Sequence, residues 1–261
     1  MRRAAEIARL RMALEETGRV LTGFCLPRDW TNSGTSGVGA EADRAADEIL
    51  KRLLPREGEG WLSEESPDDL KRLERRRVWV VDPLDGTKEF EAGLPEWCIS
   101  AALVEDGRAV AGGICNPATG ELFLGSLEDG VTLNGRRAEA RRRSHLAGAQ
   151  VLASRSELRR GDWDYPDPPF SVSPMGSVAY KLALVAAGRT DATWTLSPKH
   201  EWDVAAGVVL VLAAGGTVRT PSGRTPTFNQ RQPLLDGLVA TSAGLYPSVS
   251  RFLAAATPGS R

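Results

Sequence analysis

Two aspartates, Asp82 and Asp85, lie three positions apart at the end of an apolar run, in the stretch VWVVDPLDGTKEF of residues 78–90. Pro83 between them fixes one backbone angle and removes one hydrogen-bond donor, which is typical of a tight turn. Two carboxylates that face one point of such a turn repel each other unless a cation lies between them. Hard cations such as Mg²⁺ take oxygen ligands of this kind, so the stretch predicts either an ordinary turn or a metal site.

The residues that follow the second aspartate could bind an anion. Gly86 lets the backbone come close to a ligand. A helix that begins at Thr87 would point its free N–H groups and the positive end of its dipole at a phosphate. Carboxylates for metal beside N–H groups for phosphate are the parts of a phosphoryl-transfer site. This interpretation depends on a helix start that the residue pattern alone does not fix.

Four further acidic residues lie near predicted strand ends or helix starts. Glu64 and Glu65 close the stretch WLSEE, Asp203 follows KHEW at the start of an apolar helix, and Asp43 lies near the start of an earlier helix. Each has an ordinary alternative, because acidic pairs are common on surfaces and an aspartate at a helix start is commonly an N-cap. Their chemistry therefore depends on whether the fold brings them to the two aspartates.

Composition limits the classes of function. The chain has 261 residues with 41% hydrophobic content, which suffices for one large domain or two packed subdomains. With 33 Lys and Arg against 34 Asp and Glu, the chain lacks the basic excess of a nucleic-acid-binding protein, and the run at 75–77 is expected to face solvent. No apolar stretch reaches the roughly 18 residues that span a membrane. Three cysteines without CxxC spacing favour a reducing compartment, and we expect a cytoplasmic protein.

The periodicity of apolar residues predicts two successive blocks of structure. The first has helical spacing at about 3–24 and 40–55, then strands at 60–66, 77–82, 97–117 and 120–135, with a hairpin turn at Asp106-Gly107. The second alternates strands at 149–154, 190–196 and 237–242 with helices at 177–188, 203–216 and 244–256. Helices followed by a largely antiparallel sheet, and then an α/β layer, leave room for a site between the two halves.

Three blocks of sequence resemble one known group of enzymes. SEES at 63–66, the stretch at 78–90, and EWDVAAGVVLVLAAGG at 201–216 follow the order found in the inositol monophosphatase superfamily of Mg²⁺-dependent, lithium-sensitive phosphatases. The resemblance covers roughly residues 5–255. It implies a layered α+β and α/β sandwich (αβαβα) like that of fructose-1,6-bisphosphatase. It further implies one catalytic unit, with most metal ligands in a subdomain at 1–145 and the substrate contacts in another at 146–261.

The resemblance implies a site with two or three Mg²⁺ ions. One ion would be held by Glu64, Asp82 and the Leu84 carbonyl, and the second by Asp82, Asp85 and Asp203. Glu65 is the less favoured member of its pair. Glu64 and Thr87 would orient the attacking water, and the N–H groups of Gly86 and Thr87 would hold the phosphate. Asp43 matches an acidic residue that supports a third, weaker metal or its water shell.

Within the superfamily, DGTKEF is closer to the 3'(2'),5'-bisphosphate nucleotidases of the CysQ type, because inositol monophosphatases more often carry Asn-Phe after the threonine. This likeness implies hydrolysis of 3'-phosphoadenosine 5'-phosphate, a by-product of sulfate assimilation, to AMP and phosphate. The positions that match substrate contacts are Lys88, Ser177, Lys181 and His200, with Gly176 and the SRS stretch at 154–156 beside them. Lys88 and Lys181 could equally be solvent-exposed charges, and His200 a surface histidine.

Two stretches depart from the nucleotidase pattern. TNSGTSGVGAEAD lacks the usual lysine, proline and threonine, so the loop at 28–40 and the third metal site differ from the nucleotidase pattern. LSPKHEWD lacks an Arg-Phe-Gly that some members carry. An inositol-1-monophosphatase, or a related sugar- or histidinol-phosphate phosphatase, is therefore the alternative. A non-catalytic phosphate-ligand binder is the remote one. The expected partner is a small phosphate monoester rather than a nucleic acid polymer or a membrane, and the chain is expected to be a monomer or a homodimer.

Overall fold

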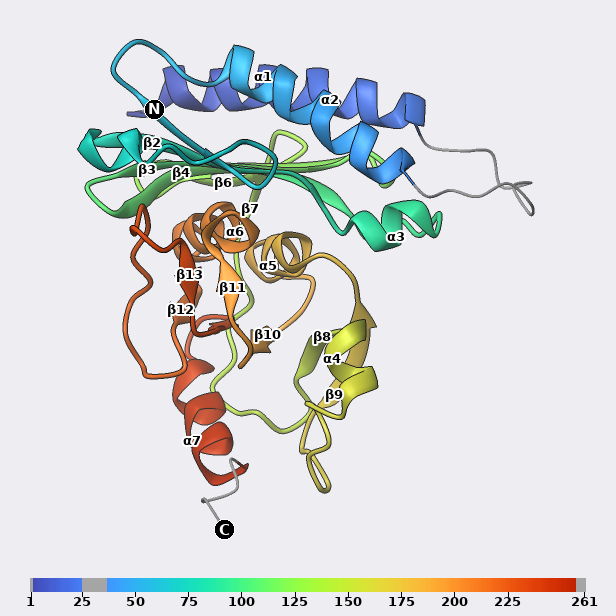
Figure 1. Ribbon diagram of the computed structural model, residues 1–261. Coiled ribbons are helices and arrows are strands. Elements are labelled where there is room, and N and C mark those ends of the chain that lie inside the picture. The colour runs from blue at the N-terminus through green and yellow to red at the C-terminus, as the bar shows by residue number, and fades with distance from the viewer. Residues whose placement is uncertain (1, 25–36, 257–261) are drawn as a thin grey trace.

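Helices and sheets alternate in five layers in the computed structural model, which describes residues 2–24 and 37–256 (Figure 1). Two long helices cover a seven-stranded sheet, two buried helices separate that sheet from a five-stranded one, and two more helices lie on the far side. This arrangement confirms the layered sandwich that the sequence predicts. The proposed division near residue 145 stays a prediction.

The outer pair of helices, α1 (Ala4–Phe24) and α2 (Val38–Leu53), forms because apolar residues recur at helical spacing along one face of each. In α1 the buried stripe includes Leu10, Leu14 and Leu21. In α2 the buried face also contains an acidic residue, Asp43, which turns toward the sheet. A carboxylate on a buried helix face is costly unless it has a partner or a function.

The seven-stranded sheet runs in the order β1-β2-β3-β4-β5-β6-β7, with β1 and β2 parallel and the other neighbours antiparallel. Its strands are β1 (Gly60–Ser63), β2 (Arg77–Asp85), β3 (Cys98–Glu105), β4 (Arg108–Asn116), β5 (Glu121–Ser126), β6 (Gly130–Leu133) and β7 (Arg136–Ala138). The predicted turn at Asp106-Gly107 is confirmed, since both residues adopt positive φ. A single-turn helix η1 (Lys71–Glu74) links β1 to β2.

The strand β2 is longer than expected. The sequence predicts a strand end at Asp82, but β2 continues through Pro83 to Asp85. The pairing with β3 shifts register between Asp82 and Asp85, so the proline lies in an irregular part of the ladder, where its missing N–H costs little. The reading of this stretch as a plain turn is therefore wrong, because both aspartates belong to the irregular end of one strand.

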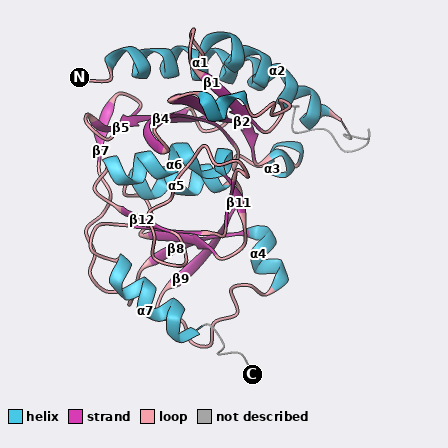
Figure 2. Cartoon of the chain, turned by 60° about the vertical axis from the view of Figure 1, so that its left-hand side comes forward, coloured by secondary structure: helices cyan, strands magenta, loops and turns pink. Residues whose placement is uncertain are grey.

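The central helices α5 (Val178–Ala186) and α6 (Glu201–Ala213) are apolar on almost every side because sheets cover them on two faces (Figure 2). Close contact between α6 and the first sheet requires small residues. A Cβ on Gly112 of β4 would lie 3.1 Å from the Cα of Ala206. The start of α6 carries Asp203, and the start of α5 carries Ser177, so both helices point their N-termini toward the end of β2.

The five-stranded sheet is mixed, in the order β12-β14-β10-β8-β9, with β8 parallel to both of its neighbours. Its elements and their neighbours are β8 (Gln150–Ser154), α4 (Arg155–Arg160), β9 (Ser171–Met175), β10 (Ala192–Thr195), β12 (Thr217–Arg219), β14 (Leu238–Thr241), α7 (Tyr246–Ala256), and the separate pair β11 (Lys199–His200) and β13 (Leu234–Leu235). Aromatic side chains fill the outer core of this half, with Trp163 stacked on Trp194 at 4.6 Å between ring centroids.

Two expectations concern residues that lie partly outside the described ranges. Most of the predicted loop at 28–40 lies outside them, as does Cys25, while Cys98 and Cys115 are buried free thiols. Within the two described ranges, no helix combines the length and apolar character needed to cross a membrane.

Candidate active site

The irregular end of β2 places two carboxylates at the boundary between the first sheet and the central helices. Asp82 is 1% exposed, and its Oδ1 accepts a hydrogen bond from the backbone N of Leu84 at 3.0 Å. A short helix, α3 (Thr87–Glu91), then begins at Thr87, which confirms the helix start on which the phosphate-site interpretation depends. The strand end and the helix start are therefore joined by Gly86 alone.

Gly86 is a position that only glycine occupies without strain. Its φ is +100°, and a Cβ there would lie 2.9 Å from the backbone oxygen of Glu96. The next residue, Thr87, places its Oγ1 3.1 Å from the Leu84 carbonyl oxygen and 3.4 Å from Asp43 Oδ2. The hydroxyl thus links the strand end to α2.

Asp85 connects the first sheet to α5. Its Oδ2 accepts hydrogen bonds from Ser177 Oγ at 2.7 Å and from the backbone N of Ala179 at 2.6 Å. Burial raises the pKa of this carboxyl, and these two donors partly offset the rise. The carboxylate of Asp85 thus holds the end of β2 against the start of α5, which lies far away in the sequence.

The remaining predicted acidic ligands approach the same region. Burial raises the pKa of Asp82 well above its usual range, and the charges of Asp85, Glu64, Asp203 and Asp43 raise it further, in that order. Burial, followed by the charges of Asp85 and Glu64, raises the pKa of Asp203 to about 8. Carboxylates that raise one another's pKa share one electrostatic environment.

Two of these carboxylates come from separate elements. Asp43 on α2 has a pKa raised to about 8, first by burial and then by Glu65 and Glu64. Glu64 lies at the more exposed mouth of the group, just after β1, and partial burial together with the charges of Asp85 and Glu65 raises its pKa. The five predicted acidic residues, which lie between residues 43 and 203 of the sequence, therefore influence one another electrostatically in the folded chain.

The acidic group fits a cation by its chemistry. Asp43 Oδ1 is buried and has no hydrogen-bond partner, and the other carboxylates are held against mutual repulsion. In residues 2–24 and 37–256, no group of three or more His, Cys, Asp or Glu side chains is arranged so that it could hold a metal ion as the side chains stand. An oxygen-rich, strongly acidic donor set of this kind suits Mg²⁺ better than a soft metal. The ligand assignments themselves remain predictions.

A pocket of about 360 Å³ opens beside Asp85 and Gly86. We call it the basic pocket, after the cationic side chains that line it, which are Lys88, Arg155, Arg159, Lys181 and Lys199. Two lining residues, Asp85 and Glu89, are acidic. The imbalance favours a negatively charged ligand next to the acidic group.

Two glutamates next to the basic pocket form ion pairs with two of its cations. Arg155 bonds through two nitrogens to Glu96, which also accepts a 2.7 Å hydrogen bond from the backbone N of Gly176. Lys199 forms an ion pair with buried Glu157. Sequence reasoning missed Arg159, Lys199 and these two glutamates. The one signal for Lys199 was its place in the departing stretch LSPKHEWD.

The predicted substrate contacts have different surroundings. Lys88 and Ser177 line the basic pocket. Lys181 also lines it, but its buried Nζ lies 3.0 Å from the carbonyl oxygen of Ser177 and near those of Met175 and Gly176. Its alternative reading as a solvent-exposed helix lysine is therefore wrong. His200 is exposed, and its ring stacks on Trp202 with centroids 4.4 Å apart.

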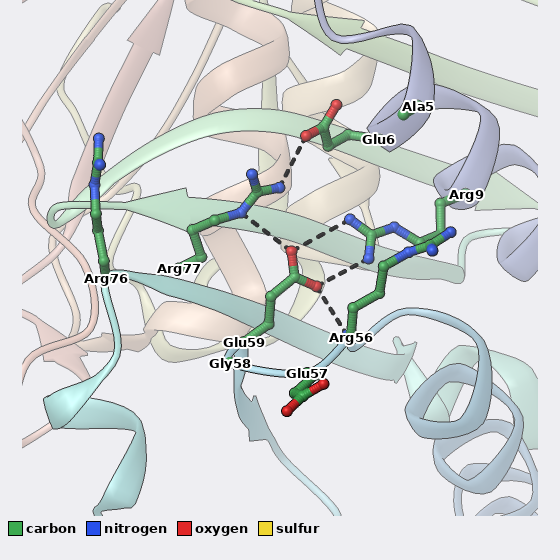
Figure 3. Close-up of a pocket in the computed structure, with 9 residues that line it drawn as sticks. All are labelled: Ala5, Glu6, Arg9, Arg56, Glu57, Gly58, Glu59, Arg76 and Arg77. Atoms are coloured by element: carbon green, nitrogen blue, oxygen red, sulfur yellow. Dashed lines mark hydrogen bonds and ion pairs between the residues drawn. The ribbon is translucent and has the colours of Figure 1, made fainter.

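A second charged pocket, of about 580 Å³, lies at the opposite end of β2 (Figure 3). Here Arg77 pairs with Glu6 and Glu59, and Arg9 pairs with Glu59 as well. Arg9 and Arg77 are thus neutralised by glutamates. In the basic pocket, by contrast, only Arg155 and Lys199 have an ion pair among the described residues. The expectation that the run at 75–77 faces solvent holds for Arg76, which is 76% exposed, and is wrong for Arg77.

The comparisons with known proteins agree with this geometry. The model of the inositol monophosphatase family matches residues 2–255, and the chain belongs to this family of phosphatases. A protein named inositol-1-monophosphatase from Rhizobium meliloti (strain 1021) is 35% identical over 193 residues, which cover 70% of this chain and 72% of the relative. The superfamily expected from the sequence is therefore confirmed.

Solved structures agree in fold over nearly the whole chain. An inositol monophosphatase from Anabaena (Nostoc) sp. PCC 7120 has a TM-score of 0.82 at 27% identity, and the match covers 99% of this chain and 98% of that one. CysQ from Bacteroides thetaiotaomicron, a bacterial member of the same family, has a TM-score of 0.78 at 25% identity, covering 91% and 97%. Family membership sets the hydrolase class, and these likenesses leave the substrate as a proposal.

Proposed function

We propose that this chain is a Mg²⁺-dependent phosphatase that hydrolyses a small phosphate monoester with an activated water. The observation that carries the proposal is that four predicted ligands interact electrostatically near the strand end that leads into α3, as the raised pKa values show for Asp82, Asp85, Asp203 and Glu64. Bound Mg²⁺ would activate the water and stabilise the negative charge of the leaving oxygen. Glu64, Asp82, Asp85, Asp203 and the Leu84 carbonyl are the groups that would hold two ions, with Asp43 beside a third.

The protein's own groups position the reactants. The N–H groups of Gly86 and Thr87, at the N-terminal end of α3, would donate to the phosphate oxygens. Thr87 Oγ1 can accept a proton from water and pass its own to Asp43 Oδ2, which lies 3.4 Å away. Glu64 at the mouth of the site would orient the same water. No nucleophilic side chain is required for these steps.

The substrate we propose is 3'-phosphoadenosine 5'-phosphate, which would yield AMP and phosphate, so the enzyme is assigned as a 3'(2'),5'-bisphosphate nucleotidase of sulfur metabolism. The basic pocket supports this assignment. A leaving group that carries a second phosphate suits a wall in which five cations outnumber two acidic residues, whereas an uncharged sugar makes no use of that excess. The cytoplasm is the proposed compartment, in agreement with two free thiols in the described residues.

The second candidate is an inositol-1-monophosphatase or a related sugar- or histidinol-phosphate phosphatase. It is favoured by the name of the relative from Rhizobium meliloti, at 35% identity. A non-catalytic phosphate binder is the remote candidate, and the intact acidic group argues against it.

A panel of substrates separates the candidates. The initial rate of phosphate release is measured with 3'-phosphoadenosine 5'-phosphate, inositol 1-phosphate and histidinol phosphate, at equal enzyme and Mg²⁺ concentrations. The proposal expects kcat/KM to be highest for the nucleotide bisphosphate. A preference of about tenfold or more for inositol phosphate would reject the nucleotidase while keeping the phosphatase, since one decade is about 1.4 kcal/mol of transition-state binding.

A further inference from the structure

Lys199 has an environment that suits it to a ligand. It begins β11 and lines the basic pocket together with Asp85 and Gly86. Its side chain is 18% exposed, so the ammonium belongs to the wall rather than to the free surface. Within the described chain its ammonium has one ion pair, to Glu157, and donates no hydrogen bond. Its N–H donors are therefore available to an anion in the pocket.

Glu157 is the fixed support under this lysine. Its side chain is 2% exposed, and it accepts hydrogen bonds of 2.5 Å from Thr195 Oγ1 and 3.1 Å from Trp163 Nε1. The distance from Glu157 Oε1 to Lys199 Nζ is 3.5 Å, which is longer than a good hydrogen bond. The glutamate thus attracts the ammonium and fixes its place without using its donors.

We propose that Lys199 is a specificity-determining residue that binds an anionic group on the leaving part of the substrate, and that Glu157 positions it. The inference rests on the proposed function, since it places the ester phosphate at the start of α3 and the leaving group in the basic pocket. Both Lys199 and that helix start border the same pocket, so one molecule can reach both. A charge-assisted hydrogen bond in a partly buried wall strengthens binding of the doubly charged substrate selectively.

The test compares two substrates that differ only in the second phosphate, 3'-phosphoadenosine 5'-phosphate and adenosine 3'-phosphate. The readout is the ratio of their kcat/KM values in the wild type and in K199M, K199R and E157Q. We expect K199M to lower the ratio roughly tenfold to a hundredfold, mainly through KM, and K199R to restore most of it. E157Q should lower the ratio less. K71M, which changes an exposed lysine paired with Asp69, serves as the matched control and should leave the ratio unchanged.

The possible failures are distinguishable. A wild type that prefers the bisphosphate, with an undiminished ratio in K199M, overturns the role of Lys199 and leaves the nucleotidase standing. A wild type without that preference rejects the nucleotidase, and the ratio for inositol 1,4-bisphosphate against inositol 1-phosphate then decides on Lys199 in the same variants. If K199M does not fold, as judged by its melting curve, K199Q and E157Q carry the comparison, and an unchanged ratio in both rejects the inference.

Discussion

The hydroxyl of Ser177 donates a 2.7 Å hydrogen bond to the carboxylate of Asp85 and thereby joins the N-terminus of α5 to the end of β2. The same hydroxyl accepts from the backbone N of Tyr180 and caps α5. Ser177 holds φ at +50°, a conformation that residues with a side chain rarely adopt. A strained residue whose hydroxyl makes these two hydrogen bonds, one of them to a buried carboxylate, indicates that the orientation of Asp85 depends on the central helix layer.

Replacing Ser177 with alanine should therefore affect both stability and catalysis. The variant loses the helix cap and one donor to Asp85, which should lower the free energy of unfolding by about 1–3 kcal/mol. Denaturant unfolding and kcat measure the two effects. Ser173→Ala, at an exposed position of β9, is the matched control. Equal stability and equal kcat in both variants would contradict the structural link.

A second pair of variants tests the joint between β2 and α3. Gly86 and Gly93 both have positive φ, but a Cβ meets the Glu96 oxygen at 2.9 Å only at Gly86, while Gly93 faces open space. Gly93→Ala should cost about 1 kcal/mol for its backbone conformation, and Gly86→Ala about 1–3 kcal/mol more, with a loss of activity. The comparison uses unfolding free energies and initial rates. A Gly86→Ala enzyme as stable and active as Gly93→Ala would contradict the prediction, because it would show that the backbone between β2 and α3 can shift to make room for a Cβ.

The pKa values of the acidic group predict how Mg²⁺ stabilises the protein. Without metal, Asp43 and Asp203 have a pKa of about 8, above the value of about 4 in the unfolded chain. The unfolded chain loses these protons first, so metal-free stability falls as pH rises from about 4 to about 8. Mg²⁺ binds the ionised carboxylates, and its addition should raise Tm more at about pH 8 than at about pH 5.5. Equal Tm shifts at both pH values would count against the acidic group as the binding site.

Removing one charge from the group should have opposite effects with and without metal. Asp203→Asn should stabilise the metal-free protein at pH 8 by roughly 1–3 kcal/mol, because a desolvated carboxylate no longer has to ionise near Asp85 and Glu64. The same variant should lose most of the Mg²⁺-dependent rise in Tm. Asp236→Asn, at an exposed position outside the group, should change neither value. A destabilised metal-free Asp203→Asn protein would mean that the carboxylate serves the fold rather than a cation.

The sequence predicts the elements that are long and periodic, and the residues that carry local chemistry. The stretch around Asp82 and Asp85 predicted an acidic site, because this signal acts over a few residues, whereas the helix start at Thr87 was a condition of the phosphate-site interpretation that only the structure supplies. The continuation of β2 through Pro83 was missed, because a proline argues locally against a strand interior, and the register shift against β3 that accommodates it depends on tertiary pairing.

The walls of the site could not be predicted for a related reason. Arg159 lies on a six-residue helix and Lys199 on a two-residue strand, and elements so short have no periodic signal. Both residues matter because they line the basic pocket, and Lys199 also because it pairs with Glu157. The pocket and this ion pair both depend on how the second sheet packs. An isolated cation in the sequence is normally a surface charge, and only the tertiary arrangement distinguishes these two.

The most direct test of the central claim is a Mg²⁺ titration of phosphate release. Protein stripped with a chelator is assayed with 3'-phosphoadenosine 5'-phosphate, alongside Asp85→Asn, while Mg²⁺ is added back in steps. We predict no release before metal is added, saturable recovery in the wild type, and a rate at least roughly a hundredfold lower in the variant. Full activity in the chelator, or an unaffected Asp85→Asn enzyme, would contradict the account.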